Sequence, residues 1–191
     1  MFTIKICGIT RPEDAQAAAR AGADAVGLNF YAKSPRAIDV GRAAKIIAAL
    51  PPGIAKVGLF VNAPPDGVCD TCDALGLDLI QLHGDEPPEY LAKLGGRPIM
   101  KAIRAAGADG LRTTVDYLAA CRALGCLPRL VLLDAPLNEG FGGSGKLADW
   151  SLAKAYQANR SWPPLVLAGG LRPQNVAEAV VAFPSESAKP V

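Results

Sequence analysis

The sequence contains little of what several functional classes require. It has one histidine in 191 residues, so sites built on two histidines are excluded, including the HExxH zinc-protease motif and the His-His-carboxylate iron site. The formal net charge is only +2, and aromatic residues make up 6%. A strongly basic nucleic-acid surface and a stacking platform for single strands both need more than this. We therefore expect no nucleic-acid partner.

Signals for export and for membrane insertion are also missing. No apolar run approaches the roughly 18 residues of a membrane span, and Met1–Cys7 lacks the basic and apolar pattern of a signal peptide. The five cysteines are an odd number, which is typical of reduced thiols. We therefore expect a cytoplasmic protein with no membrane partner.

The cysteine spacing does not indicate a metal centre. Cys69 and Cys72 form a CxxC pair, and Cys121 and Cys126 form a wider pair. Both pairs fall in segments that we predict to be helical, whereas zinc ligands usually come from loops or knuckles at regular spacing. We expect chance spacing and no bound metal.

Short apolar runs alternate with alanine-rich helical stretches, which indicates seven βα units and a parallel sheet with helices packed outside it. The candidate strands are Thr3–Cys7, Asp24–Leu28, Ala55–Val61, Asp78–Leu82, Pro98–Ile103, Arg129–Asp134 and Pro164–Ala168. The candidate helices are Pro12–Arg20, Val40–Ala49, Asp66–Leu75, Pro87–Leu94, Thr113–Leu124, Trp150–Asn159 and Pro173–Ala182. An open doubly wound sheet and a (β/α)8 barrel both fit this pattern. We expect one domain over residues 1–183, followed by a polar tail, 184–191.

Two residues at the carboxyl ends of predicted strands are candidates for acid–base chemistry, because active sites of parallel α/β folds are built there. Cys7 ends the first strand, with Lys5 two residues earlier on the same face, so the thiol could act as a base. The alternative for Cys7 is a small buried hydrophobic residue. Asp134 ends the sixth strand, where burial would favour its protonated form. The alternative for Asp134 is an Asx turn.

Other candidates are suited to binding anions. Glycines 169 and 170 lead into a predicted helix, where backbone N–H groups can hold a phosphate; the alternative is a tight turn. Arg36 follows the second strand and could clamp a carboxylate, although a lone loop arginine is usually solvated. His83 lies on the inward face at the tip of the fourth strand, where it could line a pocket.

The glycine-rich segment 140–146 resembles a nucleotide-binding loop. It nearly matches the P-loop pattern, but Leu147 occupies the position of the hydroxyl residue that would hold Mg²⁺. A mobile lid near the tip of the sixth strand is the better interpretation. Lys146 could then reach a substrate anion or remain solvated.

Taken together, the chain resembles the phosphoribosylanthranilate isomerase family of tryptophan biosynthesis. The matching segments are KICGIT (5–10), GLNF (27–30) with SPR (34–36), KVGLFVN (56–62), QLHGDE (81–86), LDA (133–135), GGSGK (142–146) and LAGGL (167–171). The resemblance implies a (β/α)8 TIM barrel that needs no cofactor and converts N-(5-phosphoribosyl)anthranilate into 1-(2-carboxyphenylamino)-1-deoxyribulose 5-phosphate. It also implies a phosphorylated small-molecule substrate and a monomer or homodimer.

The resemblance assigns a role to each candidate. Asp134 would be the general acid that opens the ribose ring, and Cys7 the general base that removes the C2′ proton. Arg36 would hold the anthranilate carboxylate, with His83 lining the substrate site, while Gly169 and Gly170 would bind phosphate through backbone N–H groups.

The family pattern continues beyond what we find here. It has an eighth strand carrying an Asp-Val-Ser-Ser-Gly-Val-Glu segment and a final helix, and residues after 183 match neither. We therefore expect a TIM barrel with seven βα units present and the eighth strand and helix missing. The alternative function is a truncated barrel remnant with little or no catalysis.

Overall fold

The computed structural model describes residues 2–105, 107–135 and 148–183. The glycine-rich segment 140–146, including Lys146, and the tail 184–191 lie outside the described residues. The chain divides into two compact units, Met1–Met100 and Lys101–Val191, which we describe in turn. Within the part that is described, no helix has the length and apolar character needed to cross a bilayer.

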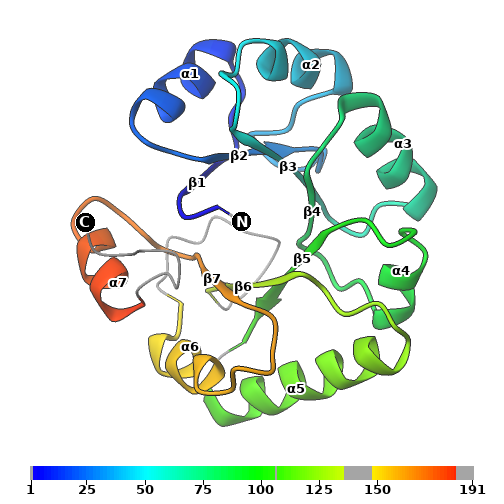
Figure 1. Ribbon diagram of the computed structural model, residues 1–191, viewed down its shortest axis with the longest axis vertical. Helices are drawn as coiled ribbons and strands as arrows, with labels where there is room; N and C mark the ends of the chain where they lie inside the picture. Colours follow the sequence, from blue (N-terminus) through cyan, green and yellow to red (C-terminus); the bar gives the residue numbers. More distant parts are fainter. Residues whose placement is uncertain (1, 106, 136–147, 184–191) are drawn as a thin grey trace. The chain divides into compact units, whose positions relative to one another are not determined.

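The first unit alternates strands and helices in chain order (Figure 1). Its elements are β1 Lys5–Cys7, α1 Pro12–Arg20, β2 Ala25–Asn29, α2 Val40–Ala48, β3 Ala55–Phe60, α3 Pro65–Leu75, β4 Leu79–Leu82 and α4 Pro88–Ala92. Neighbouring strands from β1 to β4 pair in parallel. β5, Ile99–Arg104, begins in this unit and continues into the second.

The register decides which side chains share a face of the first unit's sheet. Cys7 pairs with Gly27, which pairs with Val57. Val57 in turn pairs with Leu79, so these four residues lie on one face. The alternating residues of β2, Val26 and Leu28, belong instead to the core shared with α1 and α2. The side chains on the Cys7 face are therefore directed away from this helical layer.

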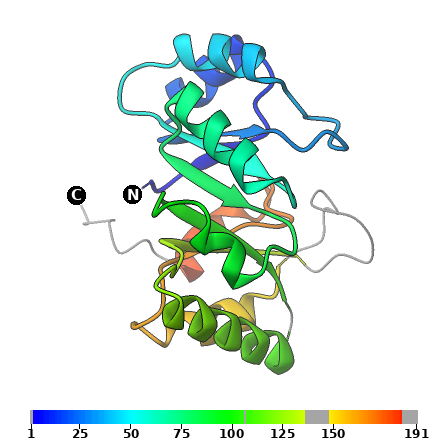
Figure 2. The same ribbon diagram turned by 90° about the vertical axis from the view of Figure 1, so that its right-hand side faces the viewer.

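The second unit repeats the same construction. Its elements after β5 are α5 Gly107–Ala123, β6 Leu130–Asp134, α6 Trp150–Gln157, β7 Leu165–Leu167 and α7 Val176–Ala182 (Figure 2). β6 and β7 pair in parallel, with Leu133 opposite Leu167. Val131 and Leu133 pack into the hydrophobic clusters formed with α5 and α6, so Leu132 and Asp134 lie on the other face.

The predicted order of seven strands and seven helices is confirmed, and strand ends differ from the prediction by at most two residues. Two helix starts were wrong. α5 begins at Gly107 rather than Thr113, because the hydroxyls of Thr113 and Thr114 donate to carbonyls four residues earlier and fit inside the helix. α7 begins at Val176 rather than Pro173. The single domain over residues 1–183 and the missing eighth unit remain predictions.

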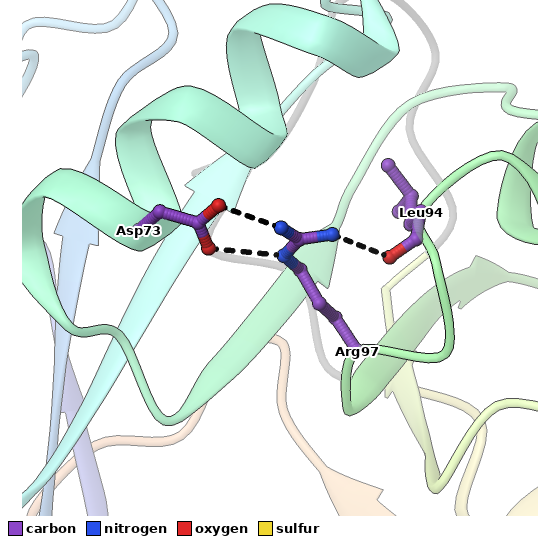
Figure 3. Close-up of polar contacts among 3 residues, drawn as sticks. All are labelled: Asp73, Leu94 and Arg97. Carbon is purple, nitrogen blue, oxygen red and sulfur yellow. Dashed lines mark hydrogen bonds and ion pairs between the residues drawn. The ribbon is translucent and has the colours of Figure 1, made fainter.

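An ion pair ties α3 to the turn before β5 (Figure 3). Arg97 Nη2 and Nε donate to the Asp73 carboxylate at 2.7 and 3.3 Å, and Arg97 Nη1 donates to the Leu94 carbonyl at 3.0 Å. The Asp73 side chain is 66% exposed, and exposed pairs contribute only about 0–1 kcal/mol. This pair therefore sets the turn geometry more than it stabilises the fold.

The Asp149 carboxylate joins the starts of α5 and α6. Its Oδ1 accepts from the backbone N–H groups of Ser151 and Leu152 at 3.0 and 3.2 Å and from the Ser151 hydroxyl at 2.6 Å. Its Oδ2 accepts from Gly107 N at 2.8 Å. These hydrogen bonds, led by that of the Ser151 hydroxyl, lower the pKa of Asp149 to about 2.

We expect Asp149→Ala to lower the free energy of unfolding by about 1–2 kcal/mol, because it removes an N-cap. Asp149→Asn keeps the Oδ1 acceptor and should lose less. Since the folded pKa is lowered, the charged form stabilises the native state above the ordinary pKa of 3.8, and this contribution fades as the pH falls towards 2. Urea unfolding of the three proteins at pH 7 and pH 3 measures both effects. Equal stability of wild type and Asp149→Ala at pH 7 would contradict the assignment.

Candidate active site

The side chains of Cys7 and Lys5 lie over a glycine of the neighbouring strand. A Cβ atom placed on Gly27 would be 2.7 Å from Cys7 Sγ and 3.2 Å from Lys5 Nζ. Both side chains are half-buried, whereas Ile4, which precedes Lys5, is 49% exposed and Ile6, which lies between Lys5 and Cys7, is 43% exposed. Gly27 therefore provides the space in which the thiol and the ammonium group lie on one face.

Arg36 packs directly against the chain that follows Cys7. Gly8 has φ +81°, and a Cβ atom there would be 2.6 Å from Arg36 Nη1 and 2.7 Å from its Cδ. Arg36 Nη1 donates to the Cys7 carbonyl oxygen at 3.0 Å. Glycine at position 8 thus serves two needs: it adopts a left-handed conformation and lets the guanidinium group lie against the backbone.

A short hydrogen-bond chain positions the loop that carries Arg36. Asn29, the last residue of β2, is 5% exposed. Its Nδ2 donates to Ser34 Oγ at 3.0 Å, and its Oδ1 accepts from Tyr31 N at 2.9 Å. Ser34 Oγ also accepts from Arg36 N at 3.1 Å. The loop after β2 is therefore ordered by side chains of its own segment.

His83 lies immediately after β4 and is 8% exposed. Gln81 pairs with Leu59, which pairs with Asn29, so Gln81 and His83 share the face of the sheet that carries Cys7. Gln81 Nε2 lies 2.8 Å from His83 Nδ1. The imidazole is therefore held on the Cys7 face within the first unit.

The backbone after His83 is held by a buried carboxylate. Glu86 is 3% exposed, and its Oε1 accepts from Asn62 N at 2.9 Å and from Gly84 N at 3.1 Å. Asn62 has φ +49°, and its Oδ1 accepts from Asp85 N at 2.8 Å. This network connects the loops that follow β3 and β4.

In the second unit, Asp134 lies against the turn after β7. Asp134 ends β6 and is 9% exposed. Its Oδ1 accepts from the neighbouring Ala135 N at 2.8 Å. Gly169 has φ +76°, and a Cβ atom there would be 2.7 Å from Asp134 Oδ1 and in contact with Ala135 N. The carboxylate and the Gly169 backbone are thus closely packed.

The glycine turn itself is shaped by Asn175. Asn175 Oδ1 accepts from Arg172 N at 2.7 Å, and its Nδ2 donates to the Gly170 carbonyl at 3.1 Å. Gly170 has φ +66°, a conformation that favours glycine. The consecutive glycines 169 and 170 therefore form a left-handed turn that the Asn175 side chain holds.

The structure brings the predicted residues together in two groups. Cys7 and Arg36 are in contact in the first unit, with His83 on the same face of the sheet. Asp134 and Gly169 are in contact in the second, followed by Gly170. The first group can exchange a proton and bind a carboxylate. The second offers a buried carboxyl group beside a glycine turn.

Three supporting residues were missed by the sequence reasoning: Asn29, Glu86 and Asn175. Asn29 is the last residue of β2, Glu86 lies in the loop between β4 and α4, and Asn175 directly precedes α7. The first two fall within the GLNF and QLHGDE segments that carry the family resemblance.

Across residues 2–105, 107–135 and 148–183, no group of three or more His, Cys, Asp or Glu side chains is suited to hold a metal ion. Burial raises the pKa of Cys72, in the CxxC pair, to about 11.

Comparisons with known proteins agree with each other. The profile of the N-(5'-phosphoribosyl)anthranilate isomerase family matches residues 4–187. The isomerase of Acidithiobacillus ferrooxidans is 49% identical over 180 residues, which cover 94% of this chain and 82% of the relative. That of Pseudomonas paraeruginosa is 50% identical over 178 residues, which cover 93% of this chain and 78% of the relative.

Solved structures of the same family share the fold. The isomerase of Thermotoga maritima superposes with a TM-score of 0.81 at 39% identity, covering 95% of this chain and 83% of that protein. A second solved isomerase, in complex with reduced 1-(o-carboxyphenylamino)-1-deoxyribulose 5-phosphate, has a TM-score of 0.78 at 35% identity, covering 95% of this chain and 82% of that protein. The chain therefore belongs to the N-(5'-phosphoribosyl)anthranilate isomerase family.

Proposed function

We propose that the protein is an isomerase of tryptophan biosynthesis that converts N-(5-phosphoribosyl)anthranilate into 1-(2-carboxyphenylamino)-1-deoxyribulose 5-phosphate. The observation that carries this proposal is the identity of 49% along 94% of the chain with an isomerase of that name. A remnant without catalysis is disfavoured, because the similarity runs through all the segments that hold the candidate residues. The proposal also extends the fold to a (β/α)8 TIM barrel.

The reaction requires a proton donor first. Asp134 protonates the ring oxygen of the ribose, the C1′–O bond breaks, and the anthranilate nitrogen takes up the positive charge as a Schiff base. Asp134 is 9% exposed and ends β6, at the carboxyl end of a parallel strand where acid–base groups of such folds lie.

The second step requires a proton acceptor. Cys7 removes the C2′ proton, and the electron pair of the broken C2′–H bond neutralises the Schiff base to give an enolamine. Tautomerisation of the enolamine yields the ketose. The Cys7 sulfur lies with the Lys5 ammonium group over the glycine of the neighbouring strand, at the carboxyl end of β1 where catalytic groups of parallel sheets lie. Atoms are conserved and no electrons are exchanged with another molecule, so the rearrangement needs no cofactor.

Binding requires partners for two anionic groups. Arg36 pairs with the anthranilate carboxylate through its planar guanidinium group, and His83 provides a further polar contact. Gly169 and Gly170 bind the phosphate through backbone N–H groups. Their positive φ values of +76° and +66° form the turn that presents these N–H groups to the anion.

Turnover by the purified protein tests the proposal. We expect N-(5-phosphoribosyl)anthranilate to be converted in the absence of any added metal or cofactor. The reaction is followed by the spectroscopic change of the anthranilate ring and by mass spectrometry, which should show a product with the mass of the substrate. A protein that binds the substrate without isomerising it would overturn the proposed function and favour the remnant.

The cellular setting follows from the function. We propose a cytoplasmic enzyme, consistent with the free thiols of Cys7, Cys69 and Cys72. We propose a monomer or homodimer; one solved relative, from Thermotoga maritima, is described as dimeric, with monomeric forms generated from it. Sedimentation of the purified protein distinguishes the two states.

Arg36→Ala should mainly raise KM. The guanidinium group contributes charge-assisted hydrogen bonds of about 1.5–3 kcal/mol, so we expect KM to rise roughly ten- to a hundredfold while kcat changes much less. Arg42→Ala, which removes an exposed arginine from the first turn of α2, is the control. If both variants kept the wild-type KM, Arg36 would be only a structural contact of Gly8.

Gly169→Ala should impair the second group of residues. The added methyl group would strain a φ of +76° and press on Asp134 Oδ1 and Ala135, so we expect kcat/KM to fall at least tenfold, the scale of a misplaced reacting group. Gly125 has φ +67° and open space around it, so Gly125→Ala imposes similar strain without this contact. Equal kcat/KM losses in the two variants would show that strain alone matters.

A further inference from the structure

Gly27 lies beside Cys7 in the sheet and leaves a gap there. The two residues pair across β1 and β2, and Val57 is the next residue along the same row. Paired residues of parallel strands place their side chains side by side on one face. Because Gly27 has no side chain, the row has an open position between Cys7 and Val57. The Cys7 sulfur uses this position, since it would lie only 2.7 Å from a Cβ atom there.

The space over Gly27 is too small to hold both the sulfur and a methyl group. Atoms that are not bonded to each other pack at about 3.5–4.0 Å, and a Cβ atom on Gly27 would lie well inside this distance from the sulfur. It would also lie 3.1 Å from Cys7 Cα, which the pairing of β1 with β2 holds in place. The sulfur is free to turn about the Cα–Cβ bond, so a side chain at position 27 would drive it to another staggered position.

The carbonyl oxygen of Gly27 has a separate task, because it holds the turn that follows Cys7. It accepts from Gly8 N at 2.9 Å and from Ile9 N at 3.1 Å. Ile9 is 5% exposed and belongs to the hydrophobic cluster that includes residues of α1 and α2. Gly8 is the residue against which Arg36 lies. The backbone of Gly27 therefore supports the Arg36 contact, whereas its missing side chain concerns the Cys7 sulfur.

We propose that Gly27 is a positioning residue for Cys7, which keeps the sulfur over β2 at the carboxyl end of β1. Any side chain at position 27 would move the sulfur from this place while leaving the turn beside Arg36 intact. The expected effect on turnover rests on the proposed function, in which Cys7 is the general base. The placement of the sulfur does not depend on that function.

Gly27→Ala tests the effect on turnover. Gly27 does not have a positive φ, so alanine fits the backbone. We expect kcat to fall roughly ten- to a hundredfold, the scale of a reacting group misplaced by about 1 Å. KM should change little, because alanine keeps the carbonyl oxygen that holds the turn after Cys7. An unchanged kcat, or a rise in KM as large as the loss in kcat, would overturn the proposal.

Gly67→Ala is the matched control. Gly67 lies in α3 and does not have a positive φ, and a Cβ atom there would have no neighbour within 4 Å beyond its own helix backbone. We expect the kcat and KM of wild type. A loss of kcat equal to that of Gly27→Ala would show that any added methyl group slows turnover, and would overturn the proposal.

Crystal structures of wild type and Gly27→Ala test the placement independently of activity. The Cys7 sulfur should lie over position 27 in wild type and in another staggered position in the variant; an unmoved sulfur would overturn the proposal. If Gly27→Ala did not fold, Gly27→Ala combined with Cys7→Ala replaces it, because the methyl group then meets no sulfur. A folded double variant supports the proposal, and an unfolded one overturns it. If wild type did not convert the substrate, the proposed function would fail, while the structures would still decide the placement.

Discussion

Cys7→Ala is expected to lower kcat by about a hundredfold or more, the scale of a lost general base. The Schiff base would still form, but no side chain at the end of β1 would remove the C2′ proton. KM should change little, because Arg36, which we propose to bind the carboxylate, donates to the backbone oxygen of Cys7, and the substitution keeps that oxygen. Steady-state kinetics measure both constants.

Two further variants sharpen this prediction. Cys7→Ser keeps the size of the side chain and replaces the thiol with a much weaker acid, so its kcat should fall almost as far as that of Cys7→Ala. Cys69→Ala removes a half-buried thiol from α3 and should leave kcat unchanged. Wild-type kcat in Cys7→Ala would remove this residue from the mechanism.

Asp134→Asn is expected to lower kcat by a similar factor of about a hundred or more, since an amide cannot protonate the ring oxygen. The substitution is nearly isosteric and keeps an oxygen that can accept from Ala135 N, as Asp134 Oδ1 does at 2.8 Å. We therefore expect the urea midpoint of unfolding to stay close to that of wild type. A large loss of stability would instead assign Asp134 to the fold.

The control for this variant is an exposed carboxylate. Asp70 lies on α3 and is exposed, so Asp70→Asn changes the same chemistry at a surface position and should leave kcat unaltered. Equal kcat in Asp134→Asn and wild type would refute the general-acid role. A pre-steady-state measurement of ring opening in Asp134→Asn and Cys7→Ala would further separate the two steps: the first should be slow only in the aspartate variant.

Local sequence patterns predicted the elements well because their causes are local. Alternating apolar residues mark a strand such as Leu130–Asp134, and alanine-rich stretches mark a helix such as Pro12–Arg20, whose predicted bounds match the observed ones. The carboxyl end of a parallel strand is a favoured place for chemistry, so Cys7 and Asp134 could be chosen from the sequence. Helix starts at Gly107 and Val176 were missed. Gly107 N donates to Asp149, 42 residues away in the sequence, and the Asn175 side chain binds Arg172 N and the Gly170 carbonyl, so residues 170–175 form a turn before α7.

By itself, the sequence determined the order of the βα elements and the family to which the chain belongs. The tertiary structure decided how the candidate residues are held. Arg36 lies on Gly8, 28 positions away, and the Glu86 carboxylate binds Asn62 N from the next loop. Contacts of this kind depend on strand register and on how closely two backbones approach. No local pattern encodes them, because neither partner has an unusual sequence neighbourhood.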